Sequence, residues 1–196
     1  MQRYEVINKL IERGGYKTYL ELGTQADKCL RLIECDYKVG VDPDPVIHYN
    51  ENSDEFHEMT SDAFFAKNQM TFDCVFIDGL HEDTQVRRDI GNSLKCINEN
   101  GCIVVHDCNP REEINQMYPM PHVGSWNGTV WRAWMAFRRS KDLKMFVVDA
   151  DEGCGVIFKG TQESFKPKII SFDLFKENRK EWLNLISEED FDGQKY

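Results

Sequence analysis

The sequence predicts an α/β fold in which helices cover both faces of a mostly parallel sheet. Short apolar runs, each ending at a Gly or an Asp, alternate with stretches that have helical spacing. Near-continuous apolar runs are typical of strands buried on both faces, and strands separated by helices imply right-handed crossovers. A length of 196 residues suits one domain. We therefore expect a three-layer sandwich formed by a single domain over residues 1–196, with its core in residues 15–160.

The first half of the chain supplies a leading helix, followed by strands and helices in alternation. The helix is expected at residues 2–13, where Ile7, Leu10 and Ile11 share one face and two glycines follow. Strands are expected at 17–22, 37–41, briefly before Asp62, and at 72–77 and 102–105. Helices are expected at 25–33, 61–67 and 82–97, the last with apolar residues at every third or fourth position.

The second half begins with an irregular segment over residues 108–127, which holds three prolines and is expected to form a long loop. A helix over 127–138 follows it. The runs 145–148 and 155–158 are expected to pair as an antiparallel hairpin, with Asp149, Asp151 and Glu152 in a solvated turn. Residues 172–196 are expected to form a last helix, over about 174–186, and an acidic tail.

Composition limits the classes of partner. The chain has 24 Lys and Arg residues and 34 Asp and Glu residues, which gives a formal net charge of −10. This argues against a nucleic-acid or anionic-membrane surface, and no apolar stretch approaches the about 20 residues that span a bilayer. The seven cysteines have no repeating spacing and no Cys-x-x-Cys pair, which is typical of free thiols. We expect a cytoplasmic protein with no nucleic-acid or membrane partner.

Acidic residues follow several of the predicted strands. They are Glu21, Asp42, Asp62, Asp78 and Asp107. In open α/β sheets the carboxyl ends of the strands line the ligand crevice, so we expect these side chains to converge on one rim. Burying several acids together costs free energy unless each one meets a donor or a cation. This convergence predicts a ligand site.

The segment from Glu21 to Gln25 has features of a nucleoside-cofactor loop. Gly23 directly after a strand lets the backbone approach a ligand closely, and Asp42 comes 21 residues after Glu21, about one strand-helix-strand unit. A carboxylate at that point can accept both hydroxyls of a ribose. The fingerprint G-x-G-x-x-G is absent, and the alternative that Gly23 only relieves a tight turn stays open.

Four motifs in order carry a family resemblance: ELGTQAD, VGVDPDP, FDCVFIDGLHEDTQVRRDI and GCIVVHDCNP. They resemble the motif series of class I S-adenosylmethionine-dependent methyltransferases, and in particular the small-molecule O-methyltransferases with Asp-Gly-x-His after strand four and His-Asp after strand five. The resemblance covers about residues 15–110. It implies a Rossmann-like fold with a mostly parallel seven-stranded sheet, an antiparallel C-terminal hairpin, and S-adenosylmethionine as the cofactor.

The resemblance also implies roles for individual residues. The implied cofactor-binding residues are Glu21 and Gly23 at the methionine end and sugar, Thr24 and Gln25 in the loop, Asp42 at the ribose hydroxyls, Asp62 and Ala63 at the adenine, and Asp78. Two positions depart from the family pattern: Asp27 stands where a second Gly is usual, and Cys108 stands where Asn or Asp is frequent.

Asp78 and Asp107 end neighbouring strands, so their carboxylates are expected to lie close together. Two such acids repel each other unless one is protonated or a cation sits between them. Mg²⁺ suits oxygen ligands and would lower the pKa of a bound substrate hydroxyl, whereas a thiol at Cys108 is a poor ligand for it. Metal-assisted and metal-free versions of the site are both open at this point.

His81, three residues after Asp78, is the candidate general base, because an imidazole titrates near neutral pH. The alternative is a histidine that only bonds backbone at a helix start. His106 is expected, by strand alternation, to point away from Asp107. Trp126 with Asn127 is the candidate substrate contact, whereas Trp131 and Trp134 are expected in the core.

These observations, together with the resemblance, predict an S-adenosylmethionine-dependent methyltransferase that methylates a hydroxyl of a small molecule. The resemblance implies a sugar or other surface-polysaccharide or natural-product precursor as the leading class of acceptor. Two alternatives remain. One is an NAD(P)-dependent oxidoreductase or epimerase on a similar sheet, which the missing G-x-G-x-x-G and the missing Tyr-x-x-x-Lys pair disfavour. The other is a noncatalytic nucleoside-binding module, which Asp27 and Cys108 keep open. An oligomer is compatible with the sequence.

Overall fold

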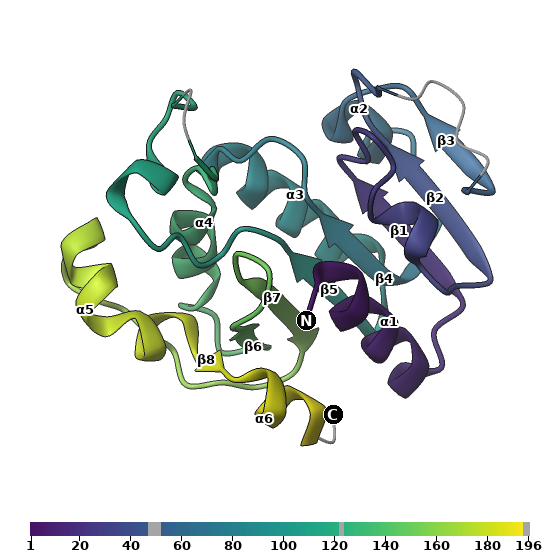
Figure 1. Cartoon of the computed structure of the whole chain (residues 1–196). Helices are drawn as coiled ribbons and strands as arrows, with labels where there is room; N and C mark the ends of the chain where they lie inside the picture. Colours follow the sequence, from purple (N-terminus) through teal and green to yellow (C-terminus); the bar gives the residue numbers. More distant parts are fainter. Residues whose placement is uncertain (47–51, 122–123, 194–196) are drawn as a thin grey trace.

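An eight-stranded sheet runs through the middle of the molecule (Figure 1). The computed structural model describes residues 1–46, 52–121 and 124–193. The strand order is β3-β2-β1-β4-β5-β7-β6-β8. The strands are β1 (Thr18–Leu22), β2 (Tyr37–Val41), β3 (Glu55–His57), β4 (Phe72–Ile77), β5 (Ile97–Val105), β6 (Leu143–Val148), β7 (Cys154–Lys159) and β8 (Leu185–Ile186).

The first five strands pair in parallel, and β7 pairs antiparallel with both β5 and β6. The predicted mostly parallel sheet with an antiparallel hairpin near its end is therefore confirmed. An eighth strand, β8, adds to the expected seven and pairs in parallel with β6. It forms because the last long helix ends early, at Asn184, whose backbone is left-handed with φ 50°, and the chain then reaches the sheet.

Six α-helices surround the sheet in the described part of the chain. They are α1 (Arg3–Gly14), α2 (Ser61–Phe65), α3 (Asp83–Cys96), α4 (Val130–Phe137), α5 (Phe172–Leu183) and α6 (Glu188–Gly193). Two short 3₁₀ helices, η1 (Leu30–Leu32) and η2 (Glu113–Gln116), lie in connecting segments. None of the helices within these described ranges is long and apolar enough to cross a membrane.

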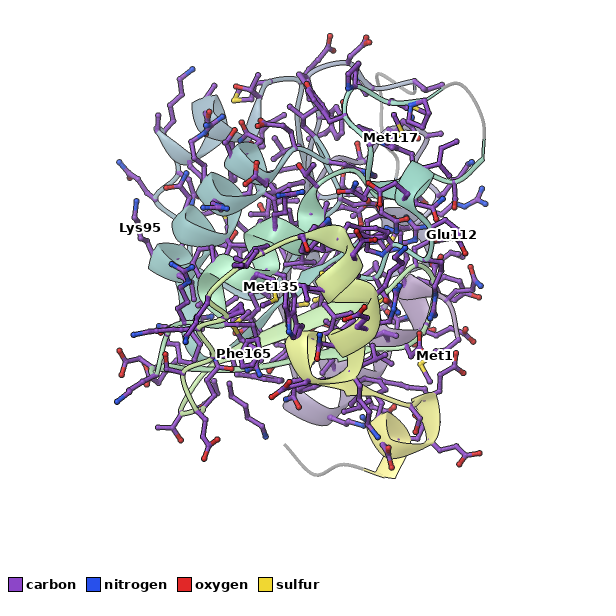
Figure 2. The ribbon with its side chains drawn as sticks, turned by 90° about the vertical axis from the view of Figure 1, so that its left-hand side faces the viewer. Met1, Lys95, Glu112, Met117, Met135 and Phe165 are labelled. Atoms are coloured by element: carbon purple, nitrogen blue, oxygen red, sulfur yellow. The ribbon has the colours of Figure 1, made fainter. Side chains whose placement is uncertain are left out.

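Two hydrophobic clusters, one on each face of the sheet, confirm the three-layer arrangement. One cluster joins residues of α2, α3, α4 and α5 to strand residues such as Leu20 and Leu22. The other joins α1, η1 and α6 to alternate strand residues such as Tyr19, as the two-residue period of a strand requires. Figure 2 looks onto α5, which lies in front of the buried Met135 of α4. Trp131 and Trp134 are fully buried in the first cluster, as predicted.

The helix expected at residues 25–33 is wrong, because only the 3₁₀ turn η1 forms there. Gln25 and Asp27 adopt positive φ values of 44° and 58°, which are incompatible with a continuing right-handed helix. The sheet face that this helix was expected to cover is packed by η1 together with α1. Since α1 immediately precedes β1 and runs back along the sheet, its first turn lies at the carboxyl ends of the parallel strands.

Candidate functional site

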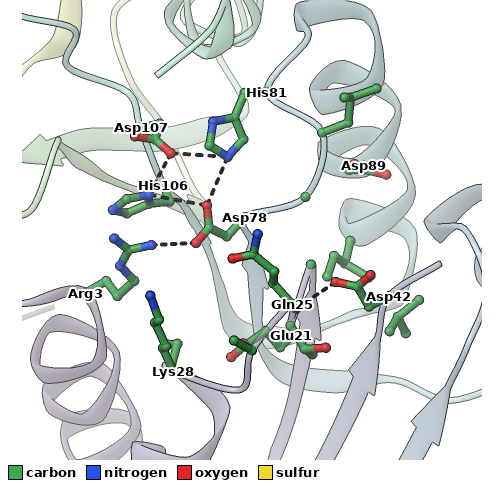
Figure 3. A pocket seen from close by; sticks show the side chains of 18 of the residues that line it. Arg3, Glu21, Gln25, Lys28, Asp42, Asp78, His81, Asp89, His106 and Asp107 are labelled. Carbon is green, nitrogen blue, oxygen red and sulfur yellow. Dashed lines mark hydrogen bonds and ion pairs between the residues drawn. The ribbon is translucent and has the colours of Figure 1, made fainter. Parts of the chain in front are cut away.

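A cavity of about 940 Å³ opens at the carboxyl ends of β1, β2, β4 and β5. This volume is in the range of pockets that bind small molecules and cofactors. Figure 3 shows that acidic side chains from several strand ends surround the same space. The predicted residues that line it are Glu21, Gly23, Thr24, Gln25, Asp42, Asp78, His81, Asp107 and Trp126. The acids expected at one rim, Asp62 excepted, are thus brought together.

Gly23 holds the ends of β1 and β4 in contact. Its φ is +89°, and a Cβ added there would come within 2.2 Å of the backbone oxygen of Asp78. A side chain at this position would therefore have to push the two strand ends apart. The glycine has a structural reason to be present, and it leaves bare backbone at the edge of the cavity as well.

Asp42 is fixed by two backbone donors beside Gly23. Its Oδ2 accepts a hydrogen bond from the Gln25 amide at 2.7 Å, and its Oδ1 accepts one from the Asp44 amide at 2.9 Å. The side chain is buried but lines the cavity. A carboxylate oxygen has more than one acceptor site, so both oxygens can still accept hydrogen bonds from a ligand.

Glu21 lies deepest on the wall, with 1% of its surface exposed. Its Oε2 accepts a hydrogen bond from the Tyr19 hydroxyl at 2.6 Å. Burial raises the pKa of Glu21 to about 8, against the hydrogen bond from Tyr19, which lowers it. The free site therefore holds a largely neutral carboxylic acid at neutral pH, and a cationic ligand group would favour its ionisation.

Asp27 does not narrow the cavity, although it replaces the second Gly of the loop. It is buried, it is not one of the lining residues, and its Oδ2 accepts a hydrogen bond from Asn52 at 2.6 Å. The left-handed backbone of Asp27 turns its side chain away from the cavity and toward Asn52. The space beside Gly23 therefore stays open although the second Gly of the family pattern is missing.

Asp62 and Ala63, the predicted adenine contacts, do not line the cavity. Thr60 caps α2 through a bond from the Ala63 amide, and this turns Asp62 toward Arg88 of α3, 3.2 Å from its Nε. The side chain of Asp62 is 48% exposed and lies outside the cavity. The neighbouring Ser61 lines the cavity instead.

Asp89 of α3 also lines the cavity, and the sequence analysis missed it. It is buried, and its Oδ1 accepts a hydrogen bond from Gln85 at 3.0 Å. Burial raises its pKa. An acid next to the apolar stripe of Val86 and Ile90 is the signal that identifies it, because a residue at that helical position faces inward.

A compact cluster of charged groups occupies the other end of the cavity (Figure 3). His81 Nε2 lies 3.3 Å from both Asp78 Oδ1 and Asp107 Oδ2. His106 Nδ1 lies 2.8 Å from Asp107 Oδ2 and 3.3 Å from Asp78 Oδ1. The predicted proximity of Asp78 and Asp107 is therefore present, and two imidazoles stand between the carboxylates.

The expectation that His106 points away from Asp107 is wrong. β5 ends at Val105, and Asp107 adopts a left-handed backbone with φ 61°. The alternation of a strand therefore no longer applies to these two residues. Both side chains turn into the same cluster, and His106 is one of the lining residues.

Arg3 and Asp151 complete the cluster, and the sequence analysis did not assign either to the site. Arg3 Nη1 lies 2.6 Å from Asp78 Oδ2, and Arg3 Nε lies 2.9 Å from Asp151 Oδ2. Asp151 was expected in a solvated turn, but its side chain is only 12% exposed. Both are identified by topology: β7 runs antiparallel to β5, so the turn before it lies at the carboxyl end of β5, as does the first turn of α1.

The charges of the cluster stabilise one another. Burial by itself raises the pKa of Asp78, but the charge of His106 and the bonds from both histidines outweigh it and hold the pKa well below its usual range. Burial lowers the pKa of His81 and His106, yet the neighbouring aspartates raise both pKa values above that of a free histidine. The aspartates therefore favour the protonated form of both imidazoles, and the imidazoles favour the ionised form of Asp78.

Asp78, His81 and Asp107 offer ligand atoms within 4.8 Å of one another, close enough to hold a metal ion. The donor set suits Mg²⁺ poorly, because one of the three donors is an imidazole and Mg²⁺ prefers six oxygens. Cys108 Sγ is 3.4 Å from the Val105 carbonyl oxygen, to which it donates. Asn109 bonds Asp149 and accepts from Arg179, so neither residue supplies a further oxygen to the cluster.

Trp126 and Asn127 were predicted together as substrate contacts, and they lie in different surroundings. Trp126 lines the cavity, and its ring stacks on that of His81 with 4.9 Å between the ring centroids. The Trp126 carbonyl oxygen lies 3.1 Å from His81 Nδ1. Asn127 is fully buried outside the cavity lining, and its Nδ2 donates to Asp107 Oδ1 at 2.9 Å. Trp126 therefore faces the cavity, whereas Asn127 lies outside it and bonds Asp107.

Comparison with known proteins gives one family match and a set of structural likenesses. Residues 20–108 match a family model described as a methyltransferase domain. This range runs from within β1 to just past the end of β5 and contains most of the strand-end residues described above. No curated protein sequence matches the chain.

Solved structures of methyltransferases are similar to the whole fold. A Staphylococcus aureus protein provisionally described as a caffeoyl-CoA O-methyltransferase is 13% identical, with 80% of this chain and 82% of that chain covered and a TM-score of 0.61. The O-methyltransferase TomG from Streptomyces achromogenes, solved in complex with SAM, is 12% identical, with 81% and 79% covered and a TM-score of 0.58. A Bacillus cereus O-methyltransferase in complex with SAH is 12% identical, with 80% of each chain covered and a TM-score of 0.57. At these identities the likeness shows the Rossmann-like methyltransferase fold.

Proposed function

We propose that this chain, a methyltransferase by its domain and its Rossmann-like fold, uses S-adenosylmethionine to methylate a hydroxyl group of a small molecule. One observation carries the proposal. A single cavity brings the bare backbone of Gly23 and the fixed carboxylate of Asp42 together with the charged cluster around Asp78 and His81. It thus offers a nucleoside end and a reactive end in one continuous space.

The residues of the nucleoside end suit an adenosyl cofactor. Asp42, held by two backbone amides, is proposed to accept hydrogen bonds from the ribose hydroxyls. Thr24 and Gln25 are proposed to contact the cofactor through the loop after β1. Ser61 and Asp89 take the place proposed earlier for Asp62 and Ala63 toward the base, because they line the cavity and those two residues do not.

Glu21 and Asp78 suit the methionine end. The ammonium group of the cofactor is proposed to lie near Glu21, whose burial gives it reason to pair with a cation. When bound, S-adenosylmethionine supplies an electrophilic methyl group on a positively charged sulfur. The acidic wall formed by Glu21 and Asp78 favours a cation at that position.

His81 is proposed as the group that takes the proton from the acceptor hydroxyl. Its Nδ1 donates to the Trp126 carbonyl oxygen at 3.1 Å. Its Nε2, 3.3 Å from both aspartates, is therefore the nitrogen proposed to take the proton. These partners raise its pKa, so it becomes a base at a higher pH than a free histidine. Asp78 and Asp107 fix the ring and stabilise the imidazolium that forms.

Methyl transfer asks mainly for alignment and for exclusion of water. Trp126, stacked on His81, is proposed to form the wall against which the acceptor lies. Asn127 takes a supporting role, because it bonds Asp107 from outside the cavity. A sugar or natural-product precursor stays the predicted acceptor.

Two observations favour a methyltransferase over the alternatives from the sequence. The methyltransferase domain match covers the strands that a nicotinamide cofactor would need. Of the two residues that keep a noncatalytic module open, Asp27 leaves the cavity free, and Cys108 donates to the Val105 carbonyl oxygen. We also propose that residues 1–196 act as one domain, because β8 pairs with β6 and the Arg13 side chain donates to the Phe191 carbonyl oxygen, which joins the two ends of the chain. A cytoplasmic location stays a proposal from the sequence. The net charge of −10 disfavours nucleic-acid and membrane partners.

Isothermal titration calorimetry with S-adenosylhomocysteine and with NAD tests the proposed cofactor. The expected result is saturable binding of S-adenosylhomocysteine, no heat with NAD, and weakened binding in Asp42→Asn. Asp62→Asn is the matched control, because it removes an acid of the same type that lies outside the cavity. Heat with NAD alone, or equal binding by wild type and Asp42→Asn, would contradict the proposal.

A further inference from the structure

The four carboxylate oxygens of Asp78 and Asp107 each meet a donor from the chain itself. Asp78 Oδ2 is bonded by Arg3 at 2.6 Å, and Asp78 Oδ1 lies 3.3 Å from both imidazoles. Asp107 Oδ1 is bonded by Asn127 at 2.9 Å, and Asp107 Oδ2 is bonded by His106 at 2.8 Å. The repulsion between the two acids, which a metal ion would otherwise relieve, is already compensated.

The position of Arg3 does not stabilise the helix to which it belongs. It is the first residue of α1, at the positive end of the helix dipole, where a cation is unfavourable. It is held there by Asp151, which accepts from the Arg3 amide and from the Arg3 Nε, each at 2.9 Å. Asp151 therefore caps the helix and aims the guanidinium at Asp78.

We propose that Arg3 takes the place of a divalent cation beside Asp78, so that the site works without Mg²⁺ and Arg3 is the positioning residue that fixes the Asp78 carboxylate. An ion bound to the same oxygen at the about 2.1 Å typical of Mg²⁺ would lie within about 5 Å of the Arg3 nitrogen. A guanidinium keeps its charge throughout the physiological pH range, so this repulsion is permanent.

The inference rests on the proposed function for its catalytic meaning, but it can be tested with the metal alone. Thermal unfolding of the full chain is measured in EDTA and in millimolar MgCl₂ or MnCl₂. Wild type is expected to melt at the same temperature in all three solutions. Arg3→Gln is expected to melt lower in EDTA and to regain about 5 °C or more when Mn²⁺ exceeds its Kd about 100-fold, whereas Mg²⁺, which the imidazole of His81 suits poorly, is expected to have a smaller effect.

Two further variants separate charge from packing. Arg3→Lys keeps the cation and is expected to stay insensitive to both metals. Arg13→Gln is the matched control on the same helix, because Arg13 bonds the Phe191 carbonyl and Asp192 at the far end of α1, and it is expected to show no metal response. A rise in the wild-type melting temperature with either metal overturns the proposal, as does a folded Arg3→Gln whose melting temperature does not change with MnCl₂.

Turnover supplies a second readout that does not depend on any variant. Wild-type methyl transfer is expected to survive exhaustive chelation, whereas activity lost to EDTA and restored by Mg²⁺ would overturn the inference. If no acceptor is methylated under any condition, the proposed function fails. The melting experiment would still decide whether Arg3 excludes the metal.

Discussion

Replacing Glu21 by glutamine is expected to stabilise the free protein, by an amount that grows between about pH 4.5 and pH 8. Glu21 is 1% exposed, and burial raises the pKa of its carboxyl group from 4.5 to about 8. Each pKa unit corresponds to about 1.4 kcal/mol, so the charged form costs about 5 kcal/mol of folding free energy. Glutamine has the same shape and keeps an oxygen that can accept the hydrogen bond from the Tyr19 hydroxyl.

The stability contributed by Glu21 decreases with rising pH because the folded protein holds the proton of this group more tightly than the unfolded chain does. Because the folded-state pKa of Glu21 is raised, the folded protein keeps this proton while the unfolded chain releases it above about pH 4.5. The contribution of Glu21 to stability therefore falls as pH rises from 4.5 to about 8, and it is constant above that. Glu21→Gln and wild type should be about equally stable near pH 4.5, and the variant should gain progressively up to about pH 8.

Urea unfolding of both proteins at pH 5, 7 and 9 measures this difference. Titratable groups other than Glu21 are shared by the two chains, so their contributions cancel in the comparison. An advantage for Glu21→Gln that is small at pH 5 and reaches several kcal/mol at pH 9 is expected. A difference that is the same at pH 5 and pH 9 would refute the link between burial and the raised pKa.

Three further outcomes are expected. Asp42→Asn should weaken binding of S-adenosylhomocysteine by about 10- to 150-fold in calorimetry, the value of a charged hydrogen bond; unchanged affinity would exclude the ribose role. Gly23→Ala should lower the free energy of unfolding by at least about 2 kcal/mol in urea, because its Cβ meets the Asp78 carbonyl at 2.2 Å, and a stability equal to wild type would show that the strand ends separate freely. Wild-type methyl transfer should rise with pH through a pKa above 6.5, since deprotonated His81 is the base and its pKa is raised. The rate of methyl transfer should fall by about 10²-fold or more in His81→Gln. If the variant keeps the pH profile of the wild type, His81 is not the base.

The sheet was predictable because its signals are local and repeated. Runs such as Phe72–Ile77 are long enough and apolar enough to define a buried strand, and the structure places β4 at those bounds. β8 was not predictable from the apolar pattern, because it is two residues long and depends on the left-handed Asn184. Positive φ at Gln25 and Asp27 likewise overrode a helical pattern.

The site was predictable as far as strand ends position it. Glu21, Asp42, Asp78 and Asp107 meet at one cavity because parallel strands end on the same edge. Asp62 does not line the cavity because it lies in the first turn of α2, where the geometry of the helix sets the direction of its side chain. The direction of a side chain next to a helix cap therefore could not be predicted from the sequence.

Arg3 and Asp151 depend on contacts between segments that are 148 positions apart. No local pattern in the sequence signals such a pair. What topology does indicate is that the first turn of α1 and the turn between β6 and β7 reach the same sheet edge. The orientation of His106 depends in the same way on one backbone angle, the positive φ of Asp107.

A crystal structure with S-adenosylhomocysteine bound tests most directly whether the cavity over Gly23 is a cofactor site. We expect the ribose hydroxyls within hydrogen-bond distance of Asp42 and the amino group beside Glu21, with the sulfur directed toward His81. Ligand density at any other place on the molecule, or an adenosine that leaves Asp42 without a contact, would contradict the assignment.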